Sequence, residues 1–274
     1  MNRLVLFLII LFYGHTVIEG QTDPQDFSAR LKSLFSRLAV REPDNVKLKV
    51  NDSIRILIDD YSLSDTVFIH RFENIRNLGQ VISGDSVLKV LSWNIIMSDG
   101  ISRYCTYFIH RADSGRNRVY SLSGTFSEAS IRTDTIYSEK DWYGALIYDI
   151  KHIRQDNDEY WLALGINYGN SSITRKVAEV INFMPDNRII FGRKLFSDGE
   201  KLLYRIVLEY SVEAVASLRF VSDSSLVFDH LVPFSPQLSG DRRFYGPDYS
   251  YDAYIRENSL WKFARDVDVR NEER

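Results

Sequence analysis

Residues 244–254, FYGPDYSYDAY, set four tyrosines and two aspartates around a Gly-Pro step. A pair of carboxylates about 5–9.5 Å apart is the arrangement that glycoside hydrolases use to cleave a sugar bond. On an extended chain, which rises about 3.3 Å per residue, Asp248 and Asp252 share a face but lie about 13 Å apart. They therefore do not form a catalytic pair by themselves, and Glu209 is the acid that would have to join one of them.

The same segment also has the composition of a binding surface. A tyrosine side chain combines a large apolar ring with a polar hydroxyl, so it can stack on a sugar or a peptide. Alternatively, the segment closes the last edge of a sheet, where Pro247 would block further pairing because it lacks an N–H group. The candidate binding residues are Tyr245, Asp248, Tyr249, Tyr251 and Asp252.

A second candidate site is the stretch SGDSVL, which resembles the Gly-Asp-Ser signature of the GDSL esterases. Together with the later stretch DIKH, it would supply Ser86 as the nucleophile, His152 as the base and Asp149 to orient the imidazole. In those esterases the serine follows a parallel strand of an α/β domain. Here Gly84 and Asp85 have the composition of a turn before an apolar strand, so a serine hydrolase stays the alternative interpretation.

The neighbours Asp229 and His230 have the composition of a general-base pair. They fall in the apolar run VFDHLVPF, which predicts a strand. Consecutive strand residues point to opposite faces, so these two side chains diverge. We expect one of them to be buried and hydrogen-bonded in a structural role.

Metal and cofactor binding have little support in the sequence. Zinc sites use His and Cys ligands at short spacings, and neither His-Glu-x-x-His nor Cys-x-x-Cys occurs. The acidic stretch at residues 156–159 lacks the glycine and the distal glutamate that let a calcium loop wrap its ion. We therefore expect no metal ion and no cofactor.

Residues 1–20 have the pattern of a signal peptide. Arg3 precedes an apolar run, Leu4–Tyr13, and Gly20 offers a small residue at the cleavage site. This run is shorter than the roughly 20 residues that a membrane-spanning helix needs. We expect cleavage before Gln21, export to the periplasm or the extracellular space, and no stable transmembrane anchor.

The charge balance argues against a nucleic-acid partner. The chain has 34 Lys and Arg residues against 37 Asp and Glu residues, a net charge of −3. Nucleic-acid binding relies on clustered positive charge, and the sequence has no such cluster. The single cysteine, Cys105, excludes an internal disulfide, so an apolar core must hold the chain together. We expect Cys105 itself to be a buried strand residue.

Two amphipathic helices are predicted within residues 21–80. Pro24 suits the first position of one helix. The apolar stripe of that helix is Phe27, Leu31, Leu34, Phe35 and Leu38. After the break at Pro43, Asn51 is predicted to cap the second helix. Such stripes must pack on another surface, so the helices are expected to cover a face or an open end of a sheet.

Residues 81–274 predict an antiparallel β-rich domain, because the apolar pattern changes to a period of two. Short turns rich in Asp, Gly and Ser make strands that follow each other in sequence neighbours in the sheet. The predicted fold is mainly β, an antiparallel meander that forms a curved sheet, a sandwich or a partly closed barrel behind a short helical segment. The predicted strands are 87–97, 103–110, 119–123, 142–150, 160–168, 173–183, 188–196, 202–210, 214–221, 226–232 and 260–265.

A series of sequence blocks is distinctive enough to compare with known families. The blocks, in this order, are NDSIRILIDDY, LSWNIIMSDGISRY, DWYGALIYDI, ITRKVAEVINF, VFDHLVPFSP, YGPDYSYDAY and DVDVRN. Together they resemble a group of uncharacterised exported proteins from Bacteroidota. The resemblance implies export to the cell envelope and transfers no catalytic residue.

These observations favour an exported, soluble, β-rich protein with a non-catalytic binding role or a role in the envelope. Its partner would be a glycan or another envelope protein. The alternative function is a hydrolase, either a serine esterase through Ser86 or a glycoside hydrolase that uses Asp248, Asp252 and Glu209 as carboxylates.

Overall fold

The computed structural model describes residues 24–111, 116–155 and 158–269. The predicted signal peptide, residues 1–20, lies outside this part of the chain, as do Asp156 and Asn157 of the acidic stretch. The predicted fold class is confirmed, because these residues are mainly β, with antiparallel sheets, one of them curled into a half-barrel, and contain two α-helices.

The two helices are α1 (Pro24–Leu38) and α2 (Asp44–Ser62). Pro24 opens α1 as predicted, but the predicted start of α2 at Asn51 is wrong, since α2 begins directly after Pro43. Asn51 is buried inside α2 instead, where its Oδ1 accepts a hydrogen bond from Trp93 Nε1 at 2.8 Å. A partner from the sheet thus satisfies the amide that was expected to cap the helix. No helix within the described ranges is long and apolar enough to cross a membrane.

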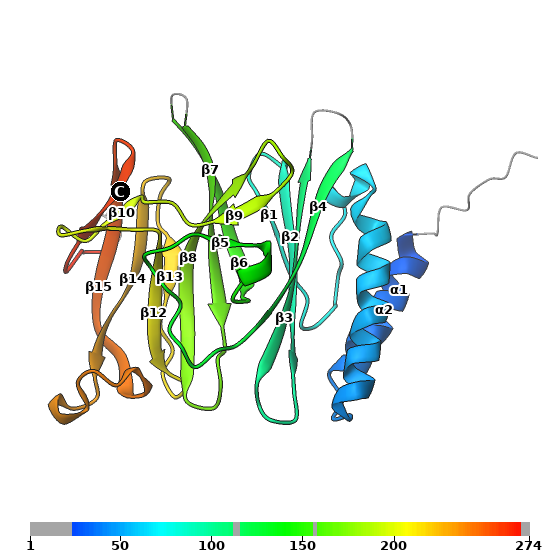
Figure 1. The fold of residues 1–274 in the computed structure, drawn as a ribbon, viewed down its shortest axis with the longest axis horizontal. Helices are drawn as coiled ribbons and strands as arrows, with labels where there is room; N and C mark the ends of the chain where they lie inside the picture. The colour runs from blue at the N-terminus through cyan, green and yellow to red at the C-terminus, as the bar shows by residue number, and fades with distance from the viewer. Residues whose placement is uncertain (1–23, 112–115, 156–157, 270–274) are drawn as a thin grey trace, which may run out of the picture.

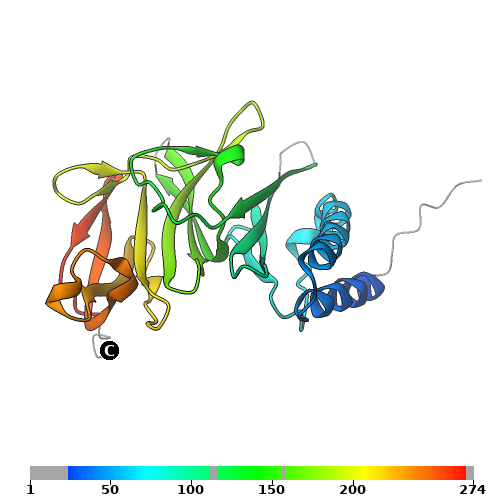
Figure 2. The same ribbon diagram turned by 60° about the horizontal axis from the view of Figure 1, so that its bottom comes forward.

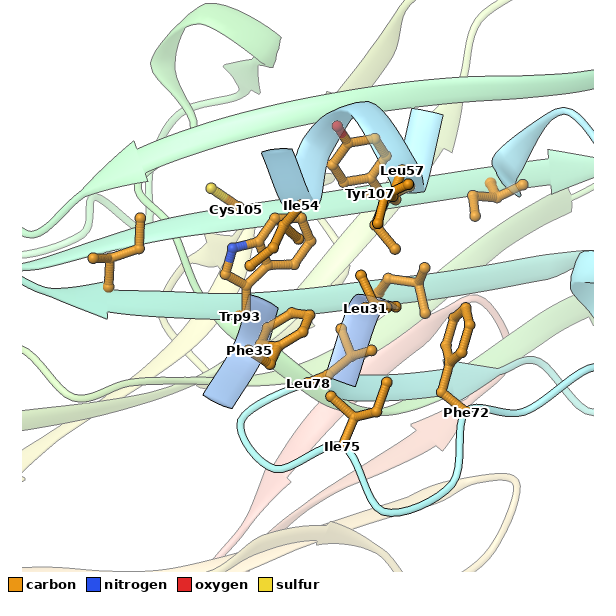
Figure 3. Packing of buried hydrophobic residues seen from close by; sticks show 14 of the residues in the cluster. Leu31, Phe35, Ile54, Leu57, Phe72, Ile75, Leu78, Trp93, Cys105 and Tyr107 are labelled. Atoms are coloured by element: carbon orange, nitrogen blue, oxygen red, sulfur yellow. The ribbon is translucent and has the colours of Figure 1, made fainter. Parts of the chain in front are cut away.

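The first sheet is fully antiparallel, in the order β1-β2-β3-β4. Its strands are β1 (Gly79–Ile82), β2 (Leu88–Ile96), β3 (Ser102–Arg111) and β4 (Asn117–Thr125). The helices cover one face of this sheet, where Leu31, Phe35 and Ile54 pack against Trp93 and Cys105 (Figure 3). Cys105 is therefore a buried strand residue, as predicted. Each fully buried Leu, Ile or Phe side chain contributes roughly 1.5–3 kcal/mol.

The second sheet has the order β5-β9-β8-β7-β6, and β12 also pairs with β8. Its strands are β5 (Tyr137–Ser138), β6 (Leu146–Gln155), β7 (Asp158–Asn167), β8 (Ile173–Phe183), β9 (Ile189–Phe191) and β12 (Arg205–Ser211). β8 is central, because β7 runs along one side of it while β12 and β9 share the other. The second sheet meets the first through a hydrogen bond from Ile147 N to Ser92 Oγ at 3.0 Å.

The third sheet has the order β11-β10-β16-β15-β14-β13 and is antiparallel except for the short β10–β16 pair. Its strands are β10 (Phe196–Ser197), β11 (Leu202–Leu203), β13 (Leu218–Phe220), β14 (Ser225–Pro233), β15 (Tyr245–Glu257) and β16 (Leu260–Ala264). The sequence did not predict β15. In the order of the sheet β15 lies between β14 and β16, but its first half, which carries Pro247, is hydrogen-bonded to β14 alone, in line with the predicted edge position. Pro247 is compatible with pairing here, since β16 joins β15 only from Ala253 onward.

Three apolar clusters hold the layers together. In both views the second sheet lies between the helix-covered first sheet and the third sheet (Figures 1 and 2). On β2, Leu91 and Trp93 face the helices, whereas Leu88 and Val90 face the second sheet. β7 alternates in the same way, as even-numbered residues such as Leu162 join a cluster with the third sheet. Burial on both faces explains why these strands are almost continuously apolar.

A buried ion pair ties β8 to β12. Glu179 and Arg205 are register partners, and Arg205 Nε donates to Glu179 Oε2 at 2.6 Å with both side chains fully buried. Tyr143 OH and Val180 N also donate to Glu179, at 2.8 and 3.0 Å. Burial raises the pKa of Glu179, and the attraction of Arg205 offsets part of this rise. Arg205 also donates to the Arg132 carbonyl, so the pair anchors the loop before β5.

A second Arg–Glu ion pair joins β8 and β12 four residues away along the same ladder. Arg175 and Glu209 are also register partners, with Nε and Oε1 2.6 Å apart. Because Arg175 and Glu179 are four residues apart on β8, both pairs lie on the same face. Arg175 also donates to the Ser127 carbonyl at 2.8 Å, so the two arginines fasten the loop between β4 and β5 at two points.

Glu179→Gln is expected to lower the free energy of unfolding by about 3–5 kcal/mol, because it leaves the buried Arg205 guanidinium without a counter-charge. Glu257→Gln is the matched control. It breaks an exposed pair with Lys262 and should cost less than about 1 kcal/mol. Urea denaturation of the two variants measures the difference, and equal losses would contradict the structural role of the buried pair.

Candidate functional site

A cleft of about 1070 Å³ opens where the first and second sheets end side by side. Val87, His110 and Arg118 line it from the first sheet, and Glu159, Trp161 and Phe183 line it from the second. The lining residues of β3 and β4 thus lie across from those of β7 and β8. Since the walls come from two separately hydrogen-bonded sheets, the packing between the sheets sets the width of the cleft.

His110, Trp161 and Phe183 form an aromatic side of the cleft, and His152 packs on Trp161 outside the lining; we call these four residues the aromatic wall. His110 stacks on Phe183 and His152 stacks on Trp161, each with ring centroids 4.2 Å apart. The Trp161 ring makes edge-to-face contacts with the rings of Phe183 and His110, with centroid distances of 5.1 and 5.2 Å. Strand register explains one of these contacts, because His152 and Trp161 are direct cross-strand partners on β6 and β7.

His152 is held from both ring nitrogens. Its Nδ1 is hydrogen-bonded to Asp85 Oδ2, and its Nε2 lies 2.7 Å from Glu159 Oε1. Only 7% of the side chain is exposed. This side chain therefore works as a clamp between the β1–β2 turn and the β6–β7 hairpin.

The contacts of His152 bear on the predicted serine triad. Its ring nitrogens contact Asp85 and Glu159, and no described contact joins it to Ser86. Asp149 does not orient it either, because Asp149 Oδ1 accepts from the backbone of Ile150 at 2.8 Å. Residues 83–86 form a turn, as the sequence indicated, and the antiparallel sheets differ from the α/β architecture of the esterases. The geometry gives the esterase alternative no assembled triad.

Three arginines line the rim of the cleft. Arg154 is neutralised locally, because its guanidinium lies 3.3 Å from Glu159 and 3.7 Å from Asp85. Arg111 stacks on the Phe68 ring at 4.2 Å. No carboxylate of the described chain lies within ion-pair distance of Arg111 or Arg118. Asp65 is the remaining acid in the lining, so the rim carries an excess of positive charge.

The Asp85 carboxylate is stabilised in its charged form. Burial by itself raises its pKa, but hydrogen bonds from Ser83 Oγ at 2.5 Å, from His152 and from Val87 N at 3.2 Å outweigh burial. The pKa of Asp85 is therefore lower than its ordinary value. The Asp85 carboxylate of the clamp is therefore charged at neutral pH.

The predicted residues of the Tyr/Asp segment do not form one face. Tyr245 is buried, and its hydroxyl accepts a hydrogen bond from Gly240 N at 2.9 Å. Asp252 is buried as well and accepts from His230 Nδ1 at 2.7 Å. The partner of His230 is thus a residue of the neighbouring strand rather than Asp229, in line with the predicted divergence of these two side chains.

Between these two residues, β15 carries a bulge that the sequence did not predict. Leu231 pairs with Pro247 and Asp229 with Tyr251, so residues 248–250 face a single residue of β14. Asp248 accepts hydrogen bonds from the Ser250 hydroxyl and backbone, and these bonds lower its pKa. Tyr251 is half-buried.

Tyr249, at the tip of the bulge, has a strained backbone and a free ring. Its φ of 72° is in the left-handed region, and its side chain is 95% exposed. Of the five predicted binding residues, only this one offers a whole ring to a partner.

The third predicted acid, Glu209, shares a smaller cavity of about 440 Å³ with Asp252 and His230. The structure therefore brings two of the three predicted carboxylates to one place. Both are engaged, since Glu209 pairs with Arg175 and accepts from Ser130 Oγ at 2.9 Å, while Asp252 binds His230. A glycosidase needs one acid free to donate a proton, and these contacts do not leave one.

Comparison with known proteins does not extend this description. The chain matches no protein-family model, no curated protein and no solved structure. Within the described ranges, no three His, Cys, Asp or Glu side chains converge as a metal ion would require. The functional argument therefore depends on the geometry of the cleft.

Asp85→Asn is expected to lower the free energy of unfolding by about 1–2 kcal/mol at neutral pH, because charged hydrogen bonds to Ser83 and His152 are lost. Since the pKa of Asp85 is lower in the folded chain, its contribution is present above pH of about 4 and disappears as the pH falls. Urea denaturation across acidic pH should show the two curves converging. Ser86→Ala, in the same turn, should keep the wild-type pH dependence, and parallel curves for Asp85→Asn would contradict the clamp.

Tyr249→Gly is expected to be more stable than Tyr249→Ala by about 1 kcal/mol, because only glycine adopts a positive φ without strain. Both variants lose the same exposed ring, so their difference isolates the backbone. In an ordinary strand the order is reversed. Thermal or urea unfolding of the pair provides the measurement, and a more stable alanine variant would disprove the strain.

Proposed function

We propose that this chain is an exported, non-catalytic binding protein of the cell envelope and that the cleft takes a glycan. The signal-like residues 1–20 and the resemblance to exported Bacteroidota proteins support export. The aromatic wall beside polar side chains is the observation that carries the binding role.

The lining of the cleft suits the surface of a sugar. A pyranose presents an apolar face of C–H groups and a rim of hydroxyls. The half-buried rings of His110 and Phe183 offer an apolar surface, and Asn182 and Glu159 offer hydrogen-bonding groups beside it. A cleft of about 1070 Å³ has room for more than one sugar ring, because typical ligand pockets measure about 300–1,000 Å³.

The contacts in the cleft support binding rather than turnover. A general base needs a nitrogen or oxygen that is free to accept a proton. His152 faces a carboxylate on each side, and Glu159 pairs with Arg154. These groups hold one another in place, which suits a rigid binding surface.

Both parts of the proposal are tested with the native protein isolated from the envelope fraction. Its measured mass should correspond to a chain that begins at Gln21. A panel of neutral, carboxylated and sulfated oligosaccharides is the probe, and isothermal titration measures the affinity of those that bind. Phe183→Leu keeps apolar volume but loses the ring, and should weaken binding by about three- to tenfold. Phe263→Leu, on β16 of the third sheet, is the matched control and should leave the affinity unchanged.

Two outcomes would contradict the proposal. If no oligosaccharide of the panel binds, the cleft is not a glycan site. If bound oligosaccharides are cleaved over time, as seen from new reducing ends, the protein is a hydrolase and the non-catalytic part is wrong.

A further inference from the structure

We infer that the glycan taken by the cleft is acidic, with a carboxylate or sulfate group of the sugar bound by Arg118 and with Arg111 adding to the positive charge of the cleft. This inference rests on the proposed function and names the class of ligand. It begins with the distribution of charge around the cleft.

The acids near the aromatic wall are already matched by cations. Glu159 lies against Arg154 and His152, and Asp85 lies against the same two side chains. The charges of these four side chains compensate one another, so they contribute little electrostatic attraction to a ligand. The guanidinium groups on the other side of the cleft have no such partners among the described residues.

Arg118 stands next to the aromatic wall because of strand register. It is the direct partner of His110 across the β3–β4 ladder, so the two side chains lie on the same face. His110 in turn stacks on Phe183. A sugar ring that lies on these rings would therefore bring a substituent at its edge close to the Arg118 guanidinium.

Arg111 also lines the cleft but, as the residue after His110 on β3, it points to the opposite face of the sheet from Arg118. Its guanidinium lies over the Phe68 ring at 4.2 Å, and its backbone N donates to the Val87 carbonyl at 2.8 Å. Stacking leaves the edge of a guanidinium, with its N–H groups, free for an anion. Such an edge suits a carboxylate or a sulfate, which arginine binds through paired hydrogen bonds.

The positive charge of the cleft contrasts with the net negative charge of the chain. The whole chain carries −3, whereas the lining of the cleft holds three arginines, Arg111, Arg118 and Arg154, against two acids, Asp65 and Glu159. A local positive field on an acidic protein selects anions and disfavours neutral ligands that could use the aromatic wall alone. The same field would be screened by salt.

The test uses the full exported chain and compares each acidic oligosaccharide that binds with its own neutral form. Carboxyl reduction converts a uronate into a neutral sugar, and desulfation removes sulfate, while both leave the sugar backbone in place. The neutral form should bind at least about tenfold more weakly, because a charge-assisted contact contributes roughly 1.5–3 kcal/mol. The affinity of the acidic form should also fall as sodium chloride is added.

Arg118→Gln provides the matching change in the protein. It keeps hydrogen-bonding capacity but removes the charge, so it should reduce the affinity for the acidic form by about tenfold and change that for the neutral form by less than about twofold. Arg243→Gln, just before β15 of the third sheet, is the control and should change neither the affinity for the acidic form nor that for the neutral form. Circular dichroism confirms that the variants are folded.

The outcomes separate this inference from the proposed function. If acidic and neutral forms bind equally well, or if Arg118→Gln weakens both to the same extent, the acidic specificity is wrong and the glycan-binding function stands. If no oligosaccharide binds in any form, the proposed function fails and this inference fails with it.

Discussion

The Glu179–Arg205 pair is the contact on which the arrangement of the second sheet depends. Removing two charges from water costs several kcal/mol per ion, so burial is tolerated only while each charge meets the other and the nearby polar groups. This requirement fixes the register of β12 against β8. Phe183 lies four residues beyond Glu179 on the same strand and the same face, so the pair that locks the strand also sets the position of a ring in the cleft.

The layered packing explains how one chain without disulfides supports a wide cleft. The first and second sheets are buried on both faces, by the helices, by each other and by the third sheet. The cleft opens only at the strand ends, where the alternation of apolar side chains stops and His110, Trp161 and Phe183 meet. The register of the strands and the packing of the sheets bring these residues together.

Local features of the chain could be predicted from the sequence, whereas contacts between distant strands could not. Pro24 indicates the start of α1, and the apolar run in residues 88–96 indicates β2, because both signals lie within a few residues. Asn51 looked like a helix cap because its tertiary partner, Trp93, lies 42 positions away. The aromatic wall was missed for the same reason, since only strand register makes His152 a neighbour of Trp161. The bulge hid β15, because Asp248, Tyr249 and Ser250 lie opposite a single residue of β14 and interrupt the alternation of the strand.

The clamp formed by Asp85, His152 and Glu159 has a consequence for the energetics of recognition. It joins the turn before β2 to the hairpin of β6 and β7, so the opposing sides of the cleft are tethered before any ligand arrives. Preorganised surfaces lose little conformational entropy on complex formation, and their backbones move by less than about 1 Å. We therefore expect the cleft to bind its ligand as a rigid, preformed site, whose selectivity depends on shape and charge complementarity instead of on the closure of a lid.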